Sequence, residues 1–269
     1  MKKIYIVKLN GDEKMKNYFD LTGKVALVTG GSSGLGVQLA TALGEQGAKI
    51  ALFARREEKL KKVQKDLEAK GIEAMYVVTD VLDTDNIAES VAKVKDRYGR
   101  IDILINGAGV AVFHPAEEQP IADWDRTIDT NLNGVYYVAR EVGKLMVEQK
   151  YGKIINIGSI HSTVAMTGLG LSAYVAAKGG VKLLTKALAT EWAKYNITVN
   201  AIGPAYFESE MTADIIADKE FEDVVKTYCP MGRVGAQGEL NGAVIYFASD
   251  SSSYTTGQLL SIDGGWTCI

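Results

Sequence analysis

The sequence predicts a single α/β domain built on an open, doubly wound sheet of seven parallel strands with helices on both faces. Short apolar runs alternate with longer stretches in which apolar residues recur at helical spacing. Strands that are apolar throughout and joined by helices are typical of a parallel sheet covered on both sides. A glycine-rich turn also follows the first apolar run directly, as expected where a buried strand leads into a helix.

The predicted strands are runs rich in Val, Ile and Leu, at residues 25–29, 49–53, 73–78, 102–106, 153–157, 198–202 and 258–262. Amphipathic stretches such as 57–70 and 83–98 lie between them. A closed eight-stranded barrel would need one more strand and would leave the glycine cluster unexplained. The chain shows no internal repeat or linker, so we expect one domain.

Composition limits the partners and sites to be expected. The chain has 269 residues and a net charge of −3, which gives no electrostatic reason to expect nucleic acid or an anionic membrane as partner. Its two cysteines, Cys229 and Cys268, are too few for a disulfide framework and lack metal-ligand spacing. With only His114 and His161 beside them, we expect no metal site.

Residues 1–20 are expected to form an arm before the domain, which spans residues 21–269. Met15 offers an alternative start for the natural chain. The apolar stretch of the arm is shorter than the roughly 7–15 residues of a secretory signal, and no run elsewhere approaches the roughly 18–20 residues of a membrane span. We therefore expect a cytoplasmic protein.

The first predicted strand leads into Thr29-Gly30-Gly31-Ser32-Ser33-Gly34-Leu35-Gly36, and a helix begins at once. Glycines at such a turn let the chain bend sharply, let a pyrophosphate approach the backbone, and let the helix pack close to the strand. The start of the helix offers unpaired amides and the positive end of its dipole. The turn therefore predicts a dinucleotide site of the Rossmann type.

The spacing of this loop, TGxxxGxG, resembles that of the short-chain dehydrogenase/reductase family, and further motifs follow in the family's order. They are Asn106-Gly107-Ala108-Gly109 after the fourth strand, Asn131 in Asn-Leu-Asn-Gly, Ser159 after the fifth strand, Tyr174 with Lys178, and Asp263-Gly264-Gly265. The resemblance covers about residues 20–269. It implies an oxidoreductase that moves hydride between a nicotinamide cofactor and a secondary alcohol or ketone. It also implies a homo-tetramer.

The resemblance assigns catalytic roles to Asn131, Ser159, Tyr174 and Lys178. Tyr174 and Lys178 lie one helical turn apart and so share a face. A phenol titrates near 10, and we expect the Lys178 cation to lower the pKa of Tyr174 so that it acts as general acid or base. The resemblance implies that Ser159 orients the substrate oxygen, with Ser162 as a minor alternative. It also implies that Asn131 distorts its helix and retains a water linking Lys178 to solvent.

The cofactor contacts implied by the resemblance are Gly30, Ser32, Ser33, Gly34, Leu35, Gly36, Arg55, Arg56, Asp80, Val81, Asn106, Gly107, Ala108, Tyr174, Lys178, Pro204 and Ala205. Ala205 stands where the family usually has glycine, so the backbone there should not need a positive φ. The second strand leads into Arg55 and Arg56, with no carboxylate before Glu57 to bind the ribose hydroxyls of NAD. A guanidinium fork suits a phosphate, so we expect Arg55 to contact the 2′-phosphate of NADP, with NAD as the alternative.

Residues 205–235 occupy the place of the family's substrate-covering segment, where variation changes the substrate. Segments 113–118, 209–212 and 263–267, together with His161, resemble the bacterial branch close to gluconate 5-dehydrogenases, which implies a sugar acid or polyol. We expect substrate contacts from Ser159, His161, Tyr174 and Tyr206, although His161 would face water if its loop is exposed. Hydroxysteroid dehydrogenases and 3-oxoacyl-carrier-protein reductases share the core motifs and are the alternatives. A non-catalytic NADP-binding sensor would be expected to lose part of the catalytic set, which is complete here.

Overall fold

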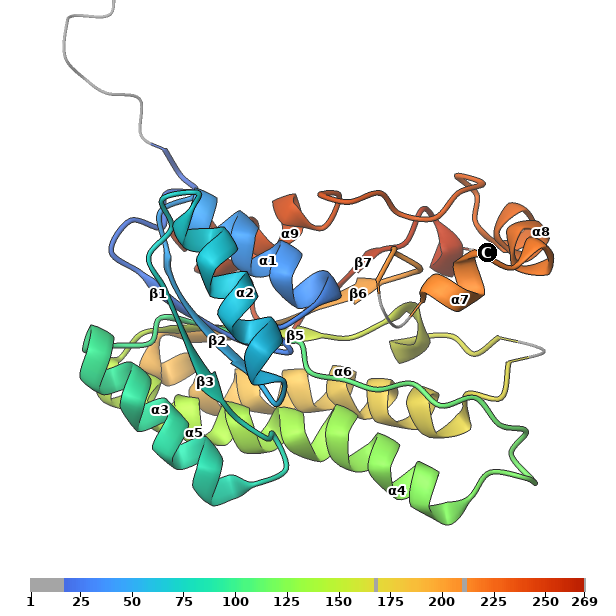
Figure 1. Ribbon diagram of the computed structural model, residues 1–269, viewed down its shortest axis with the longest axis horizontal. Helices are drawn as coiled ribbons and strands as arrows, with labels where there is room; N and C mark the ends of the chain where they lie inside the picture. The colour runs from blue at the N-terminus through green and yellow to red at the C-terminus, as the bar shows by residue number, and fades with distance from the viewer. Residues whose placement is uncertain (1–16, 167–168, 210–211, 269) are drawn as a thin grey trace, which may run out of the picture.

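The computed structural model describes residues 17–166, 169–209 and 212–268, so most of the predicted arm lies outside the described residues. The described residues form one parallel sheet with the strand order β3-β2-β1-β4-β5-β6-β7 (Figure 1). The sheet is open, with β3 and β7 at its edges, so the predicted fold class is confirmed and the barrel is excluded. Each strand lies within two residues of its predicted bounds: β1 Val25–Thr29, β2 Lys49–Ala54, β3 Ala74–Val78, β4 Ile103–Asn106, β5 Gly152–Ile157, β6 Ile197–Pro204 and β7 Leu259–Ile262.

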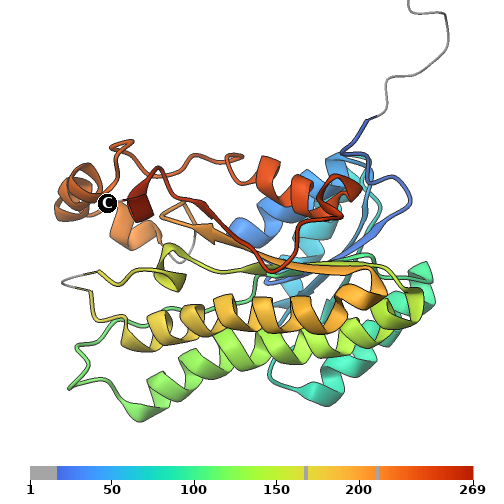
Figure 2. The same cartoon turned by 180° about the vertical axis from the view of Figure 1, so that it is seen from behind.

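Helices cover both faces of the sheet (Figures 1 and 2). One face carries α1 (Gly34–Glu45), α2 (Glu57–Glu68) and α9 (Asn241–Ala248), and the other carries α3 (Thr84–Tyr98), α5 (Gly134–Gln149) and α6 (Ser172–Trp192). A short π-helix, Asp129–Asn133, joins α4 (Ile121–Ile128) to α5, while α7 (Ala213–Ile216) and α8 (Lys219–Tyr228) follow β6. Because strand side chains alternate, Val28 and Ile105 enter the core under α1, whereas Leu27 and Leu104 enter the core under α5.

A third, smaller core lies apart from the sheet under α7 and α8. Its buried members are Ile160, Tyr206, Phe221, Val225, Cys229 and Trp266. Tyr206 is central, because its ring contacts Phe221 at 4.7 Å and Trp266 at 5.3 Å between centroids. The segment after β6 is thus packed on its own apolar cluster.

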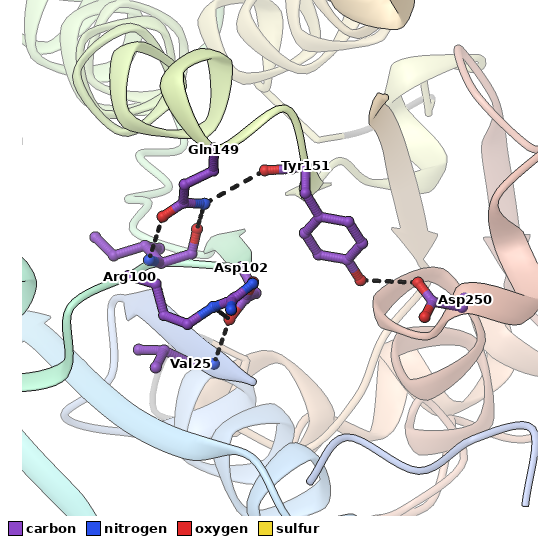
Figure 3. Close-up of polar contacts among 7 residues, drawn as sticks. Val25, Arg100, Asp102, Gln149, Tyr151 and Asp250 are labelled. Atoms are coloured by element: carbon purple, nitrogen blue, oxygen red, sulfur yellow. Dashed lines mark hydrogen bonds and ion pairs between the residues drawn. The ribbon is translucent and has the colours of Figure 1, made fainter. Parts of the chain in front are cut away.

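A polar network ties the strands together at the amino end of the sheet (Figure 3). The Asp102 carboxylate, fully buried, accepts hydrogen bonds from the Val25 amide at 3.0 Å and from Arg100 Nε at 2.8 Å. Gln149 at the end of α5 bonds both the amide and the carbonyl of Ile101, and Tyr151 donates to Asp250 at 2.9 Å. Since a buried carboxylate is retained only when it is paired, these contacts fix β1 against β4 at this end.

Lys153 lies beside this network at the start of β5, with only 2% of its surface exposed. Its Nζ lies 3.5 Å from the hydroxyls of Ser252 and Ser253. Burial lowers the pKa of Lys153 to about 8, because the charged amine is poorly solvated. The folded chain therefore binds a proton here less readily than the unfolded chain does.

Replacing this amine should remove a pH-dependent part of the stability. Between pH 8 and the ordinary lysine pKa of 10.5 the unfolded state holds the proton more firmly, so the wild type gains stability as pH rises through this window. We expect Lys153→Met to be more stable than the wild type at pH 7, by up to about 3 kcal/mol, with the difference shrinking towards pH 10.5. Urea unfolding at several pH values measures it. Lys62→Met, an exposed site on α2, is the control, and a pH-independent difference at Lys153 would contradict the prediction.

Candidate active site

The site begins at the point where the strand order reverses. The chain adds β2 and β3 on one side of β1 and then returns to place β4 on the other, which opens a crevice beyond the carboxyl ends of β1 and β4. Gly30 follows β1 with φ +71°, and a Cβ on it would lie 2.8 Å from the Gly107 carbonyl oxygen after β4. The two turns therefore meet through bare backbone, which only glycine allows at Gly30.

The start of α1 is shaped to receive an anion. A Cβ on Gly36 would lie 2.3 Å from the Gly30 carbonyl oxygen, so the first turn of the helix packs directly on the loop. The first turn carries no acidic side chain, and the N-cap residue Ser33 makes no capping bond from its hydroxyl. The helix amides and the positive end of the dipole thus remain available to a phosphate.

A cavity of about 470 Å³ runs from this loop to the predicted catalytic residues Ser159, Tyr174 and Lys178. It joins the ends of β1, β2, β3, β4, β5 and β6 to the start of α6. Most of the predicted site residues line it: Gly30, Ser32, Ser33, Gly34, Leu35, Gly36, Arg55, Arg56, Asp80, Val81, Gly107, Ala108, Ser159, Tyr174, Lys178, Pro204 and Ala205. Ala205 fits because, among the described residues, a positive φ outside glycine occurs only at Lys150 and Asn196.

Four predicted residues do not line the cavity: Asn106, Asn131, His161 and Tyr206. The cavity wall also includes residues that were not among the predicted site residues, namely Phe53, Ala54, Thr79, Gly109, Val110, Thr130, Ile157, Gly158, Phe207, Ser209 and Thr212. Most of these flank a strand end and were open to prediction from that position. Ser209 was not, because its place depends on the segment after β6 folding back until its Cβ lies 3.2 Å from the position of a Cβ on Gly34.

The two arginines after β2 make different contacts. Arg56, rather than Arg55, reaches the glycine loop and donates to the hydroxyls of Ser33 at 2.8 Å and Ser32 at 3.4 Å. Both arginines are exposed and line the cavity. The end of β2 therefore presents two guanidinium groups and no carboxylate beside the loop.

Ser159, Tyr174 and Lys178 meet at the other end of the cavity. Ser159 follows β5, and its hydroxyl lies near the phenol of Tyr174 in the first turn of α6. Lys178, one turn further on, is 5% exposed and donates from Nζ to the Ile157 carbonyl at 2.6 Å. Ser162 does not line the cavity, since its hydroxyl turns back to accept from the Ser159 amide, so Ser159 is the better candidate.

The electrostatics of Tyr174 correct one prediction. Its pKa is raised, because burial disfavours the phenolate, and the Ser159 hydrogen bond only partly opposes this. Lys178 does not lower the pKa of Tyr174 as expected: its Nζ lies 5.6 Å from the centroid of the Tyr174 ring and is directed at Ile157. Burial lowers the pKa of Lys178 itself to about 8. In this state Tyr174 is a protonated phenol.

Asn131 lies in the π-helix between α4 and α5, where the helix is distorted. Its fully buried side chain accepts from the Val110 amide at 2.8 Å and donates to the Val110 carbonyl at 2.7 Å. Val110 itself lines the cavity, so Asn131 holds a piece of the wall in place.

His161 is buried, at 4% exposure, so the alternative that it faces water is wrong. Its ring stands edge-on to those of Tyr174 and Tyr206, at 6.0 and 6.5 Å between centroids. Burial lowers the pKa of His161, which keeps it neutral. Since the Val164 carbonyl can only accept, the 3.1 Å contact from Nδ1 places the proton there and leaves Nε2 as an acceptor 3.5 Å from the Tyr206 hydroxyl.

The fold and the site together define a dinucleotide-binding oxidoreductase, with a glycine loop at one end of the cavity and a Ser-Tyr-Lys set at the other. The profile of the short chain dehydrogenase family matches residues 24–220. The chain belongs to this family and is a nicotinamide-dependent alcohol dehydrogenase or ketone reductase.

Similar proteins match over nearly the whole chain. Gluconate 5-dehydrogenase of Gluconobacter oxydans (strain 621H) is 42% identical over 93% of this chain and 96% of its own length. The 5-keto-D-gluconate 5-reductase of Escherichia coli (strain K12) is 37% identical over 93% and 98%. A crystal structure of a gluconate 5-dehydrogenase from Burkholderia cenocepacia J2315 in complex with NADP and tartrate has a TM-score of 0.90 and 37% identity, covering 94% of this chain and 98% of that one.

The contact between Gly36 and Gly30 yields a prediction on nucleotide binding. Gly36→Ala would place a methyl group 2.3 Å from a carbonyl oxygen, forcing the loop away from α1. We expect NADPH affinity to fall at least about 10-fold, since close backbone approach is what the loop provides. Gly242→Ala in α9, where no atom lies within 4 Å of the new Cβ, is the control and should keep its affinity and gain up to about 1 kcal/mol of stability. Fluorescence titration decides, and equal NADPH affinity in the two variants would contradict the prediction.

Proposed function

We propose that the protein is an NADP(H)-dependent enzyme that interconverts a secondary alcohol and a ketone on a sugar acid or polyol, as the gluconate 5-dehydrogenases do. The observation that carries this proposal is the convergence of Ser159, Tyr174 and Lys178 on one end of a cavity whose other end is the glycine loop. The similarity to gluconate 5-dehydrogenases over almost the whole chain supports the substrate class.

The chain's own residues supply the proton and the orientation. The half-buried Tyr174 phenol, whose raised pKa keeps it protonated, is set to donate to a substrate carbonyl oxygen during reduction and to recover the proton during oxidation. Ser159 hydrogen-bonds the same oxygen and holds it beside Tyr174. The nicotinamide, when bound, gives or takes the hydride. Lys178 would hold the nicotinamide end together with Pro204, which ends β6, and Ala205, which follows it. Asn131 with its water would connect Lys178 to solvent.

The choice of NADP has support at the adenosine end. Arg55 and Arg56 line the cavity beside Ser33, where a 2′-phosphate would find two guanidinium groups. Asp80, also on the wall, would bind the adenine. The residues of the glycine loop, together with Gly107 and Ala108, would supply the remaining cofactor contacts. Asn106 would support the turn at Gly107 without touching the cofactor.

Two uncharged side chains pack behind Tyr174 at the substrate end of the cavity. We propose that His161 and Tyr206, which pack beside Tyr174, recognise substrate hydroxyl groups, since neutral His161 offers an acceptor and no positive charge. Residues 205–235, which include α7 and α8, would cover the bound substrate.

The proposal includes a homo-tetramer in the cytoplasm. Large apolar side chains are exposed on the outer side of α4, α5 and α6, at Ile121 (73%), Tyr136 (42%) and Leu183 (67%), which suits pairing of these helices between subunits. The cytoplasm is where NADPH is regenerated. Within the described part of the chain, no helix has the length and hydrophobicity to cross a membrane.

A substrate panel with one variant tests the function. Polyols, sugar acids, steroids and oxoesters are each assayed with NADP(H) and NAD(H). We expect the highest kcat/KM on a sugar acid or polyol with NADP(H). In Tyr174→Phe turnover should fall at least about 10²-fold, because the proton donor is lost, while NADPH affinity stays the same. Tyr254→Phe, on a fully exposed tyrosine, should match the wild type. Near-normal turnover in Tyr174→Phe, or a clear preference for steroids or oxoesters, would refute the corresponding part of the proposal.

The two arginines should separate in a cofactor titration. Arg55→Ala should weaken NADPH by about 10- to 100-fold, the loss of roughly 1.5–3 kcal/mol for a charge-assisted contact, and leave NADH unchanged. Arg56→Ala should weaken NADPH in the same way and also weaken NADH slightly, because Ser33 loses its partner. Arg126→Ala, exposed on α4, is the control for lost charge. Equal losses of NADPH and NADH in Arg55→Ala would contradict a phosphate contact.

A further inference from the structure

Three buried polar side chains cross the apolar layer behind the catalytic residues. Asn106 ends β4, Asn156 lies in β5, and Thr185 lies in α6, with exposures of 2%, 0% and 1%. Asn106 and Asn156 are paired neighbours in the register of β4 with β5. They point to the same face as Leu104 and Ile154, which are packed among apolar side chains.

The three side chains form one hydrogen-bonded chain. Asn106 Nδ2 donates to Asn156 Oδ1 at 2.9 Å and to the Val135 carbonyl at 3.3 Å. Asn156 Nδ2 donates to Thr185 Oγ1 at 2.9 Å, and Thr185 donates in turn to the Val181 carbonyl at 2.8 Å. The direction is fixed, because the carbonyls of Val135 and Val181 can only accept. The chain therefore links β4, β5, α5 and α6 in a single arrangement.

The contribution of these hydrogen bonds to folding stability does not explain why three polar side chains are buried here. Three polar groups buried with their partners contribute little net free energy, and apolar side chains of similar size would serve the core as well. In addition, Asn106 Oδ1 is buried without a hydrogen-bond partner among the described residues, which is unfavourable. What directional bonds provide, and apolar packing does not, is one defined position of the helix against the sheet.

This hydrogen-bonded chain lies next to Lys178 on both β5 and α6. Asn156 immediately precedes Ile157, whose carbonyl accepts from Lys178 Nζ at 2.6 Å. Thr185 lies two turns beyond Lys178 on the same side of α6. Strand β5 thus holds α6 at two points, Asn156 to Thr185 and Ile157 to Lys178. Sliding or rotation of α6 would break both bonds together.

We propose that Asn156 and Thr185 are positioning residues that set α6 against β5, so that Lys178 and Tyr174 stand at the correct height beside Ser159. Asn106 extends the same constraint to the turn at Gly107, which forms the facing wall of the cavity. The inference rests on the proposed function for the catalytic roles of Tyr174 and Lys178, but not for the geometry.

Two variants with a conservative rescue test the proposal. Thr185→Val removes only the hydroxyl. Asn156→Leu with Thr185→Val removes both partners of the Asn156–Thr185 bond, and Asn106 Nδ2 keeps the Val135 carbonyl as its acceptor. Thr185→Ser restores the hydroxyl. The control, Thr190→Val, removes an exposed hydroxyl of α6 that bonds back to Ala187. For each we would measure the melting temperature, NADPH affinity, kcat and KM on the best substrate of the panel, and amide hydrogen exchange of peptides covering residues 172–181.

We expect the double variant to keep its melting temperature to within a few degrees, and its NADPH affinity and KM to within about 2-fold. Its kcat should fall at least about 10-fold, and residues 172–181 should exchange at least about 10-fold faster while α5 is unchanged. Thr185→Ser and Thr190→Val should behave as the wild type. Wild-type kcat and exchange in the double variant would overturn the proposal. If no compound of the panel reacts with the wild type, the proposed function fails, and the exchange rates alone decide the positioning role.

Discussion

The site depends on one steric constraint, the contact of two backbone turns at the centre of the sheet. Gly30 and Gly107 approach so closely that a Cβ on Gly30 would lie 2.8 Å from the facing carbonyl oxygen. This contact brings the ends of β1 and β4 together beneath the start of α1, so that the crevice opens directly above a helix dipole. The glycine loop and the cavity beside it take their positions from this contact.

The chemistry at the opposite end of the cavity depends on burial rather than on direct charge pairing. Tyr174 and Lys178 share a face of α6, yet each is governed by its own surroundings: the phenol keeps its proton, and the amine is directed at a main-chain carbonyl. Tyr174 is therefore in its acid form. A cofactor bound between these groups would change the surroundings of both, which couples nucleotide binding to the readiness for proton transfer.

The features that the sequence predicted correctly are those that depend on the local order of residues along the chain. The strands and the turn at Gly30 follow from apolar periodicity and glycine spacing, and the shared face of Tyr174 and Lys178 follows from the pitch of a helix. What the sequence could not predict are tertiary contacts. Which arginine reaches Ser33 depends on side-chain direction, and the burial of His161 depends on aromatic rings contributed from far along the chain. The one error, the lowered pKa of Tyr174, arose because the surroundings of the phenol were unknown. No spacing encodes these.

The small core around Tyr206 and Trp266 is separate from the two cores that flank the sheet. Substitutions in it disturb few of the contacts that hold the strands together, and the amino-end network of Asp102 and Arg100 lies at the other end of the sheet. The molecule thus combines a sheet held by its two flanking cores with a separate small core under α7 and α8. If residues 205–235 cover the substrate as proposed, mutations there can change the substrate preference with little loss of folding stability, which makes this region the natural starting point for engineering.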